Sequence, residues 1–214
     1  MSAGVVRVLP EMGRPPYLPF LKGSPTFEPN LKPIPVERWL LPDTESDTGL
    51  PDKWIMMTTR SADVIAGDIH SGACHEVLAL VKAATVEQPT DNWKSPLEAA
   101  ASLVSDDICI LEPDGWGDWV LRAAVLAAPT YWTLSNRIGR TLGGLHRPVP
   151  GGDPGLAGRI GKVFSGLRPD VVLERFNWTV QANGLRFTPQ RPFADGQTSE
   201  DLHLRVERQT VRKL

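Results

Sequence analysis

Cysteine is scarce in this chain of 214 residues, and its scarcity excludes two kinds of structure. The two cysteines, Cys74 and Cys109, lie far apart in the sequence and form no CxxC motif. The sequence therefore indicates neither a disulfide framework nor a cysteine-based zinc site. We expect a protein of a reducing compartment, with the cytoplasm as the default.

Long apolar runs and an excess of positive charge are also missing. The longest apolar stretches, such as residues 120–129, contain a charged residue and fall far short of the roughly 20 residues of a membrane-spanning helix. The N-terminus lacks the basic start and apolar core of a signal peptide. The formal net charge of −2 does not provide the concentrated positive field of a nucleic-acid or membrane-surface protein. We expect neither membrane nor nucleic acid among the partners.

The remaining composition is that of an ordinary globular domain, with two exceptions. Prolines crowd the first 50 residues, which predicts an extended arm, disordered over its first dozen residues, beside a folded domain at 51–214. The second exception is the seven tryptophans, which are spread along the chain. Most are expected in core or lid packing, although large flat side chains can also form the wall of a pocket for a planar cofactor.

Hydrophobic periodicity predicts an α+β fold. Helical spacing covers residues 52–86, with breaks at Gly67 and Gly72, and residues 97–103, 134–142 and 156–167. Ser95 is a candidate N-cap for the helix at 97–103. Alternation predicts strands at 107–111, 118–128, 171–180 and 202–209. This order favours an antiparallel sheet with helices packed over one face, and such a sheet encloses a natural ligand pocket.

One histidine, His146, has a distinctive local sequence. Gly143 and Gly144 precede it and predict a helix C-terminus, because glycine readily adopts the left-handed conformation. Pro148 and Pro150 follow it, and each biases its preceding residue towards extended backbone. We expect an extended segment that presents the imidazole as a metal ligand or catalytic group. A hydrogen-bonded structural histidine is the alternative.

The predicted strand at 171–180 contains an arginine on an apolar face. Alternation places Arg175 and Asn177 on one face, and Phe176 and Trp178 on the other. The residues two and four positions before Arg175 are apolar, so its face should point inward. A buried arginine needs an anionic partner, which here would be a cofactor carboxylate, a bound oxygen species or Glu207.

The predicted strand at 202–209 is also rich in charge. Arg205, Glu207 and Gln209 share one of its faces. An exposed sheet face with cross-strand ion pairs is the alternative explanation for both charged strands. A further acidic pair, Asp106-Asp107, precedes the first strand, and we interpret it as turn or strand-edge residues and not as an acid–base dyad.

Six short blocks, taken together, carry a family resemblance. They are Val104-Ser105-Asp106-Asp107-Ile108, Ala128-Pro129-Thr130-Tyr131-Trp132, Arg137-Ile138-Gly139, Leu145-His146-Arg147-Pro148-Val149-Pro150, Arg175-Phe176-Asn177-Trp178 and Leu204-Arg205-Val206-Glu207-Arg208-Gln209-Thr210. In order and approximate spacing they resemble the α-subunit family of haem-dependent oxidative N-demethylases. The resemblance covers the chain from about Pro19 to the C-terminus.

The resemblance implies that residues 51–214 form a PAS-like domain that binds haem b. Such a protein is a monooxygenase that demethylates a small secondary amine, such as dimethylamine, with O2 and electrons from NADPH. Partner subunits, a reductase and a folate-binding subunit, carry FMN, a 2Fe-2S cluster and tetrahydrofolate. The alternative is a PAS sensor or interaction module that binds haem or another small molecule without turnover.

The resemblance also implies roles for individual residues. His146 would be the proximal haem ligand. Arg175 would hold a haem propionate or polarise bound oxygen, and Trp178, in the same block, would lie at the cofactor. Glu207 and Arg205 would position the ammonium substrate or relay protons.

The chain departs from the family pattern at Asp106-Asp107, at Val211, where the family often has leucine, and at its C-terminal end. Asp106-Asp107 stands where the family typically has Glu-Asp. Family members continue beyond Lys213-Leu214 into a further strand and a helical tail. For a fragment or a shortened member we therefore expect a sheet edge without a partner and a partly open pocket.

Overall fold

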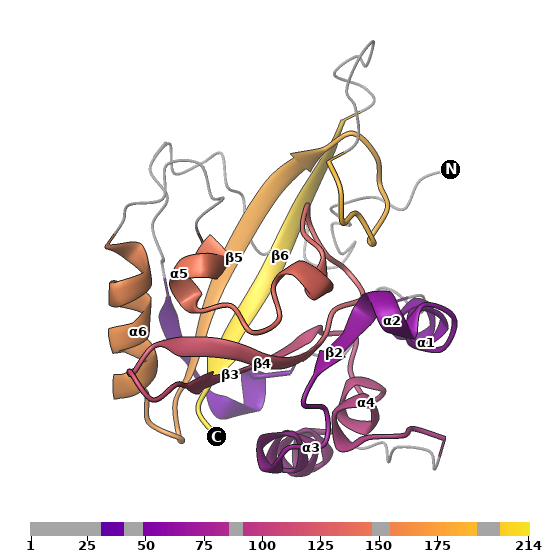
Figure 1. Cartoon of the computed structure of the whole chain (residues 1–214). Helices are drawn as coiled ribbons and strands as arrows, with labels where there is room; N and C mark the ends of the chain where they lie inside the picture. Colours follow the sequence, from indigo (N-terminus) through magenta and orange to yellow (C-terminus); the bar gives the residue numbers. More distant parts are fainter. Residues whose placement is uncertain (1–30, 41–48, 86–91, 147–154, 192–201) are drawn as a thin grey trace.

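Strand pairing produces two small antiparallel sheets. The computed structural model describes residues 31–40, 49–85, 92–146, 155–191 and 202–214 (Figure 1). One sheet has the order β1-β5-β6 and consists of β1 (Lys32–Ile34), β5 (Val172–Gln181) and β6 (His203–Arg212). The other has the order β2-β4-β3 and consists of β2 (Ile65–Gly67), β3 (Ile108–Pro113) and β4 (Trp119–Val125). The predicted α+β class is confirmed, with the strands divided between two sheets.

The helices of the described residues gather in two groups (Figure 1). On the side of β2 lie α1 (Gly49–Thr59), α2 (Ser61–Val64), α3 (Gly72–Ala84) and α4 (Pro96–Ala101). On the other side lie α5 (Leu142–His146) and α6 (Leu156–Gly166). Two short 3-10 helices, η2 (Val36–Arg38) and η3 (Leu134–Asn136), complete the helical elements. The prediction of helix over 156–167 is confirmed by α6.

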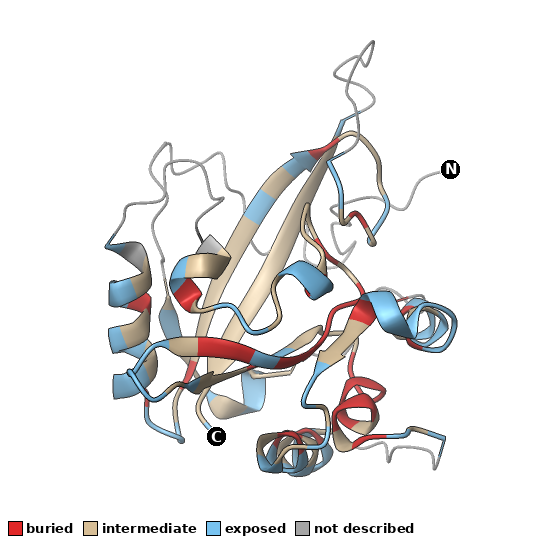
Figure 2. Ribbon diagram, viewed as in Figure 1, coloured by how far each residue is buried: buried red, intermediate tan, exposed pale blue. Residues whose placement is uncertain are grey.

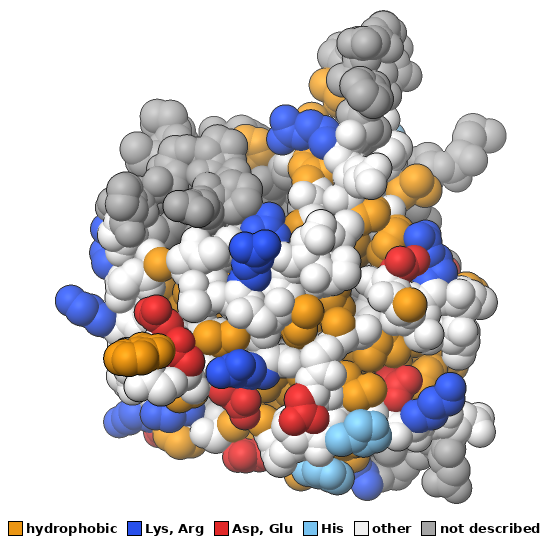
Figure 3. All heavy atoms as spheres, viewed as in Figure 1, with side chains coloured by type: hydrophobic (Ala, Val, Ile, Leu, Met, Phe, Trp, Pro, Cys, Tyr) orange, Lys and Arg blue, Asp and Glu red, His pale blue; other side chains and the backbone are white. Residues whose placement is uncertain are grey.

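Two observations concern the molecular surface. On the face shown in Figure 3, Lys and Arg side chains are interspersed with Asp and Glu side chains. No helix in the described part of the chain is long and apolar enough to cross a membrane.

The main core lies between β4 and the helices α3 and α4 (Figure 2). β4 is the central strand of its sheet, and Ala123 and Val125 are fully buried. Val81 from α3 and Leu97 from α4 pack into the same cluster. Burial of one such aliphatic side chain contributes roughly 1.5–3 kcal/mol, so this cluster holds the helices of the β2 side against the sheet.

The predicted start of α4 is confirmed in detail. Ser95 is its N-cap, and its Oγ accepts a hydrogen bond from the backbone N–H of Glu98 at 3.1 Å. The same hydroxyl donates to the Glu98 carboxylate at 2.8 Å. Because the first turn of a helix leaves backbone donors unpaired, a cap of this kind contributes about 1 kcal/mol.

A strand replaces the end of the first predicted helix. The periodic pattern predicted helix as far as Gly67, but α1 ends at Thr59, α2 ends at Val64, and the next three residues pair with β4 as β2. Gly67 has φ +94°, and a Cβ there would collide with the backbone of Arg122. Glycine is required because the two backbones approach so closely. The helix prediction was wrong here because this long-range pairing leaves no periodic signal.

The segment before His146 also differs from its prediction. η3 ends at Asn136, and Gly139, at φ 77°, turns the backbone towards β4. The Gly139 N–H donates to the Leu121 carbonyl at 2.8 Å, and the Leu121 N–H donates to the Arg140 carbonyl at 3.0 Å. Pairing with β4 therefore replaces most of the helix that was predicted over 134–142.

Consequently, the two glycines before His146 lie inside α5 and do not end a helix. α5 begins at Leu142, and its last residue is His146. The Thr141 hydroxyl accepts a hydrogen bond from the Gly144 N–H at 3.3 Å and so stabilises the start of α5. The predicted extended presentation of His146 was wrong, since its backbone is helical. Its side chain and the two following prolines lie outside the described residues.

A buried lysine fastens α1 to the rest of the domain. Lys53 is 2% exposed, and its ammonium group donates to the carbonyl of Val104 at 3.1 Å and to that of Asp106. Removal from water lowers the pKa of Lys53 to about 8, and the charges of Asp107 and Asp106 act in the opposite direction.

This burial predicts a pH-dependent stability. Between pH 8 and 10.5 the unfolded chain binds more protons at Lys53 than the folded chain, so the contribution of Lys53 to the free energy of unfolding rises with pH in this window. The expected rise is on the order of 3 kcal/mol. Lys53→Met should flatten it in urea unfolding, whereas Lys82→Met, which alters an exposed lysine of α3, should keep the wild-type slope. An unchanged slope in Lys53→Met would contradict the assignment.

Candidate functional site

A cavity of about 1700 Å³ lies between the edges of the two sheets. All six residues of β3 and residues 205–212 of β6 line it. Side chains alternate between the faces of a strand, so a cavity that contacts consecutive residues borders the strand edges. Among the described residues, β3 and β6 are edge strands. The cavity is larger than the roughly 300–1,000 Å³ typical of ligand pockets.

One wall of the cavity is aromatic and apolar. Its aromatic residues are Trp119, Trp132 and Phe164, and its aliphatic residues include Leu111 and Leu126. The rings of Trp119 and Phe164 meet edge to face, with their centroids 5.6 Å apart. Such a wall offers flat, polarisable surface to an apolar ligand.

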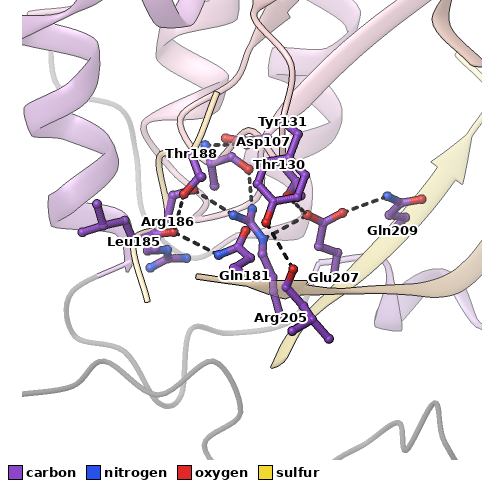
Figure 4. A network of polar contacts seen from close by, with 12 residues as sticks. Asp107, Thr130, Tyr131, Gln181, Leu185, Arg186, Thr188, Arg205, Glu207 and Gln209 are labelled. Atoms are coloured by element: carbon purple, nitrogen blue, oxygen red, sulfur yellow. Dashed lines mark hydrogen bonds and ion pairs between the residues drawn. The ribbon is translucent and has the colours of Figure 1, made fainter. Parts of the chain in front are cut away.

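Polar side chains of β6 form a second part of the lining, the polar wall. Arg205, Glu207 and Gln209 lie on one strand face, as the alternation predicted (Figure 4). The pairing register sets Asn177 opposite Glu207 and Arg175 opposite Gln209. Directly opposed residues share a sheet face, so the polar residues of both strands form one surface.

Three donors hold the carboxylate of Glu207. Arg205 Nε lies 3.0 Å from Oε1, and the Thr130 hydroxyl donates to the same oxygen. The Gln209 side-chain amide donates to Oε2 at 3.3 Å. The side chains of Arg205 and Glu207 are only 13% and 22% exposed. Oε2 receives one long hydrogen bond from these three groups and keeps capacity for another donor.

The loop after β4 delivers Thr130 to Glu207. Asp107 accepts hydrogen bonds from the backbone N–H groups of Ala127 at 2.8 Å and Ala128 at 2.9 Å. Arg205 donates to the carbonyl of Ala128 (Figure 4). Tyr131 then adopts φ +59°, which is uncommon for a residue other than glycine. Hydrogen bonds on both sides of the loop hold this costly conformation in place.

Burial changes the acidity of several groups at the cavity. It raises the pKa of Asp107 and of Asp106, and the charge of Lys53 is the strongest opposing influence on both. Cys109 is open to the cavity but has protein on its other sides. Burial, together with the charge of Asp107, raises the pKa of its thiol to about 12. The thiol therefore stays protonated and is a weak nucleophile at neutral pH.

The predicted site residues occupy four different places. Arg205 and Glu207 line the cavity. Arg175 shares their sheet face, but it is not among the described residues that line the cavity. Trp178 lies on the opposite face and is 47% exposed, so the geometry gives no support to its predicted contact with a cofactor. His146 ends α5, and its side chain lies outside the described residues.

Sequence reasoning missed Thr130 as a site residue and assigned no ligand-side role to Asp107. The interpretation of Asp107 as a turn or strand-edge residue agrees with its two hydrogen bonds to backbone N–H groups. Thr130 belongs to one of the six blocks, and that membership was the only signal for it. Nothing local reveals its contact with Glu207, because 77 positions separate the two residues.

Comparison with known proteins agrees with the blocks quoted above. A search of curated proteins finds no match. The family model described as haem-dependent oxidative N-demethylase, alpha subunit-like, matches residues 69–214. This span is more than half of the chain and includes β3 to β6, and thus both strand edges that border the cavity. The chain therefore belongs to the haem-dependent oxidative N-demethylase, alpha subunit-like family.

Proposed function

We propose that this chain is the haem-binding subunit of a cytoplasmic oxidative N-demethylase that acts on a small secondary amine such as dimethylamine. The cavity is the observation that carries the proposal, because both aromatic and charged residues of the family-matched region line it. A planar apolar cofactor suits the aromatic and apolar wall. A small cation suits the polar wall, where Glu207 presents a carboxylate.

The residues of the apolar wall fit haem b. The cavity volume of about 1700 Å³ accommodates a large planar group together with a small substrate. α5 packs through Leu142 and Leu145 against Leu111 and Trp119, so the backbone that carries His146 adjoins this wall. His146 would ligate the iron. Arg175 shares the sheet face of Glu207 but lies outside the described cavity lining, and it would hold a carboxylate of the cofactor from there. When bound, haem supplies the redox chemistry with O2.

The polar wall fits a secondary ammonium ion. Its N–H would donate to Glu207 Oε2, which keeps acceptor capacity. Arg205 and Thr130 fix the carboxylate from the other side, so the carboxylate is oriented before the substrate arrives. Glu207 would also take the proton that the ammonium ion has to lose before its N-methyl group is oxidised.

The stoichiometry of the reaction requires electrons from outside this chain. Oxidation of one N-methyl group by O2 consumes two external electrons and two protons and yields the demethylated amine, formaldehyde and water. We propose that the electrons pass from NADPH through partner subunits carrying FMN and a 2Fe-2S cluster. The formaldehyde is then released or passed to tetrahydrofolate on a folate-binding subunit. The description of the matched family as an alpha subunit is consistent with partner subunits.

Haem binding is the first test of the proposal. Titration of the purified protein with haem should give a Soret band of a protein-bound haem. His146→Ala should lose or shift that band and weaken haem binding at least about tenfold, because the iron loses its axial ligand. His75→Ala removes an exposed histidine of α3 and should behave as wild type. Equal spectra and affinities in all three proteins would show that another group holds the iron.

Substrate binding is the second test. Glu207→Gln should weaken dimethylammonium binding by roughly 10- to 100-fold, since a hydrogen bond to a charged group contributes roughly 1.5–3 kcal/mol. The measurement is the spectral change of the haem-loaded protein on titration with dimethylammonium. Glu37→Gln alters an exposed carboxylate of η2 and is the matched control. An equal affinity in Glu207→Gln and the control would exclude Glu207 as the ammonium site.

Turnover separates an enzyme from a binding module. With a reductase supplied, the proposed enzyme forms formaldehyde in a reaction that depends on both NADPH and amine. Haem binding without formaldehyde formation would favour the non-catalytic PAS module.

A further inference from the structure

Asp107 lines the cavity beside the polar wall, and Lys53 lies behind it and connects it to the core. Lys53 reaches from α1 to the carbonyls of Val104 and Asp106, directly before Asp107 in the chain. It does not line the cavity among the described residues, and its hydrogen bonds go to the carbonyls of residues 104 and 106 and not to β6. Any influence of Lys53 on a ligand therefore passes through the segment it holds.

Asp107 carries the connection across to the next segment. Both of its carboxylate oxygens are used, one by the N–H of Ala127 and the other by the N–H of Ala128. Charge-assisted hydrogen bonds of this kind are about twice as strong as neutral ones, and two of them fix both position and orientation. The backbone at residues 127–128 is thus set by one side chain.

The last step leads from that backbone to Glu207. The Ala128 carbonyl accepts a hydrogen bond from Arg205, and Arg205 pairs with Glu207. Two residues further along, the Thr130 hydroxyl donates to the same carboxylate. The two groups that orient Glu207 Oε1 are Arg205 and Thr130. Arg205 is bonded to residue 128 and Thr130 follows two residues later, so the positions of both depend on the backbone at 127–128 that Asp107 holds.

We propose that Asp107 and Lys53 are positioning residues for the Arg205–Glu207–Thr130 cluster, and that the angle at which Glu207 meets a cationic ligand depends on them. This inference rests on the proposed function, in which Glu207 binds the ammonium ion. Lys53 fixes the backbone at 104–106 through two hydrogen bonds. Asp107 then fixes the backbone at 127–128. Thr130 and Arg205, which depend on that backbone, orient the Glu207 carboxylate. A shift of Asp107, whose two oxygens already accept backbone N–H groups, turns Glu207 away from its ligand.

The loop geometry explains why such a support is needed. Tyr131, next to Thr130, has φ +59°, a conformation that a free loop with this residue would rarely choose. The Tyr131 N–H donates to the Thr188 carbonyl at 2.7 Å on one side of the loop, and Asp107 acts on the other. Loss of the Asp107 bonds leaves the loop free to relax.

Hydrogen exchange in the cofactor-free protein tests the positioning directly. Asp107→Asn keeps the side-chain shape but replaces one acceptor oxygen with an NH2 group. That group cannot accept a hydrogen bond from the backbone N–H of residue 127 or 128. The amides of residues 127–131, apart from Pro129, which has no N–H, should then exchange at least about tenfold faster, because a bond to a charged acceptor is lost. Lys53→Met should raise exchange in the same segment. The amides of Val77 and Val81 in α3 should keep their wild-type rates in both variants. Asp118→Asn, at an exposed position of the β3–β4 turn, is the control.

A double-mutant cycle supplies the readout that a purely structural role would not move. In the haem-loaded protein, Asp107→Asn should weaken dimethylammonium binding about tenfold when Glu207 is present, and should have no further effect in the Glu207→Gln background. Equal effects in the two backgrounds, or unchanged exchange at 127–131, would overturn the positioning role. The exchange measurement needs no cofactor. If the protein fails to bind haem, the proposed function is overturned, and the exchange rates still decide whether Asp107 and Lys53 position the loop. If Asp107→Asn does not fold, Lys53→Met carries both measurements.

Discussion

The ten-residue antiparallel pairing of β5 with β6 is the constraint on which the site depends. It sets Asn177 opposite Glu207 and Arg175 opposite Gln209, so polar residues from two strands share one surface. A register shift of one residue would turn Glu207 to the face that bears Phe176 and Trp178. The opposite face has its own fastening, since Arg208 pairs with Glu174 at 2.6 Å and donates to the Trp39 carbonyl at 3.0 Å. That ion pair holds the register in place from behind the site.

Nearby hydrogen-bond partners compensate the charged groups that this domain buries or partly buries, and no general excess of opposite charge is involved. Lys53 is buried and Glu207 and Asp107 are partly buried, and each has hydrogen-bond partners of suitable geometry nearby. Such groups add little net stability, because desolvation offsets most of the attraction. Their consequence is specificity of position, since any other arrangement would leave a buried charge without a partner. The cavity wall is therefore stiff where it is polar.

The sequence predicted the long, regular elements and missed the parts that depend on distant partners. β5, β6 and α6 follow from alternation or helical spacing, because those patterns are local and extend over ten residues or more. β2 has three residues, and its identity depends on contact with β4 through Gly67. The faces of Arg175 and Glu207 were each predictable, but their common surface required the register of two strands. Thr130 and Asp107 became site residues only when the fold brought segments 20 and 77 positions apart into contact.

The two strand edges that border the cavity affect how a ligand is recognised, because they offer it backbone hydrogen-bonding groups. On the sides turned away from β4 and β5, the main-chain N–H and C=O groups of β3 and β6 have no strand partner among the described residues. A molecule lodged there meets a ladder of peptide groups whose positions do not change when side chains are substituted. Relatives with the same backbone can thus differ in their cavity-lining side chains and still hold a ligand in the same position and orientation. Discrimination between ligands then has to come from the few side chains that project beyond the ladder, with Glu207 and the tryptophans foremost among them.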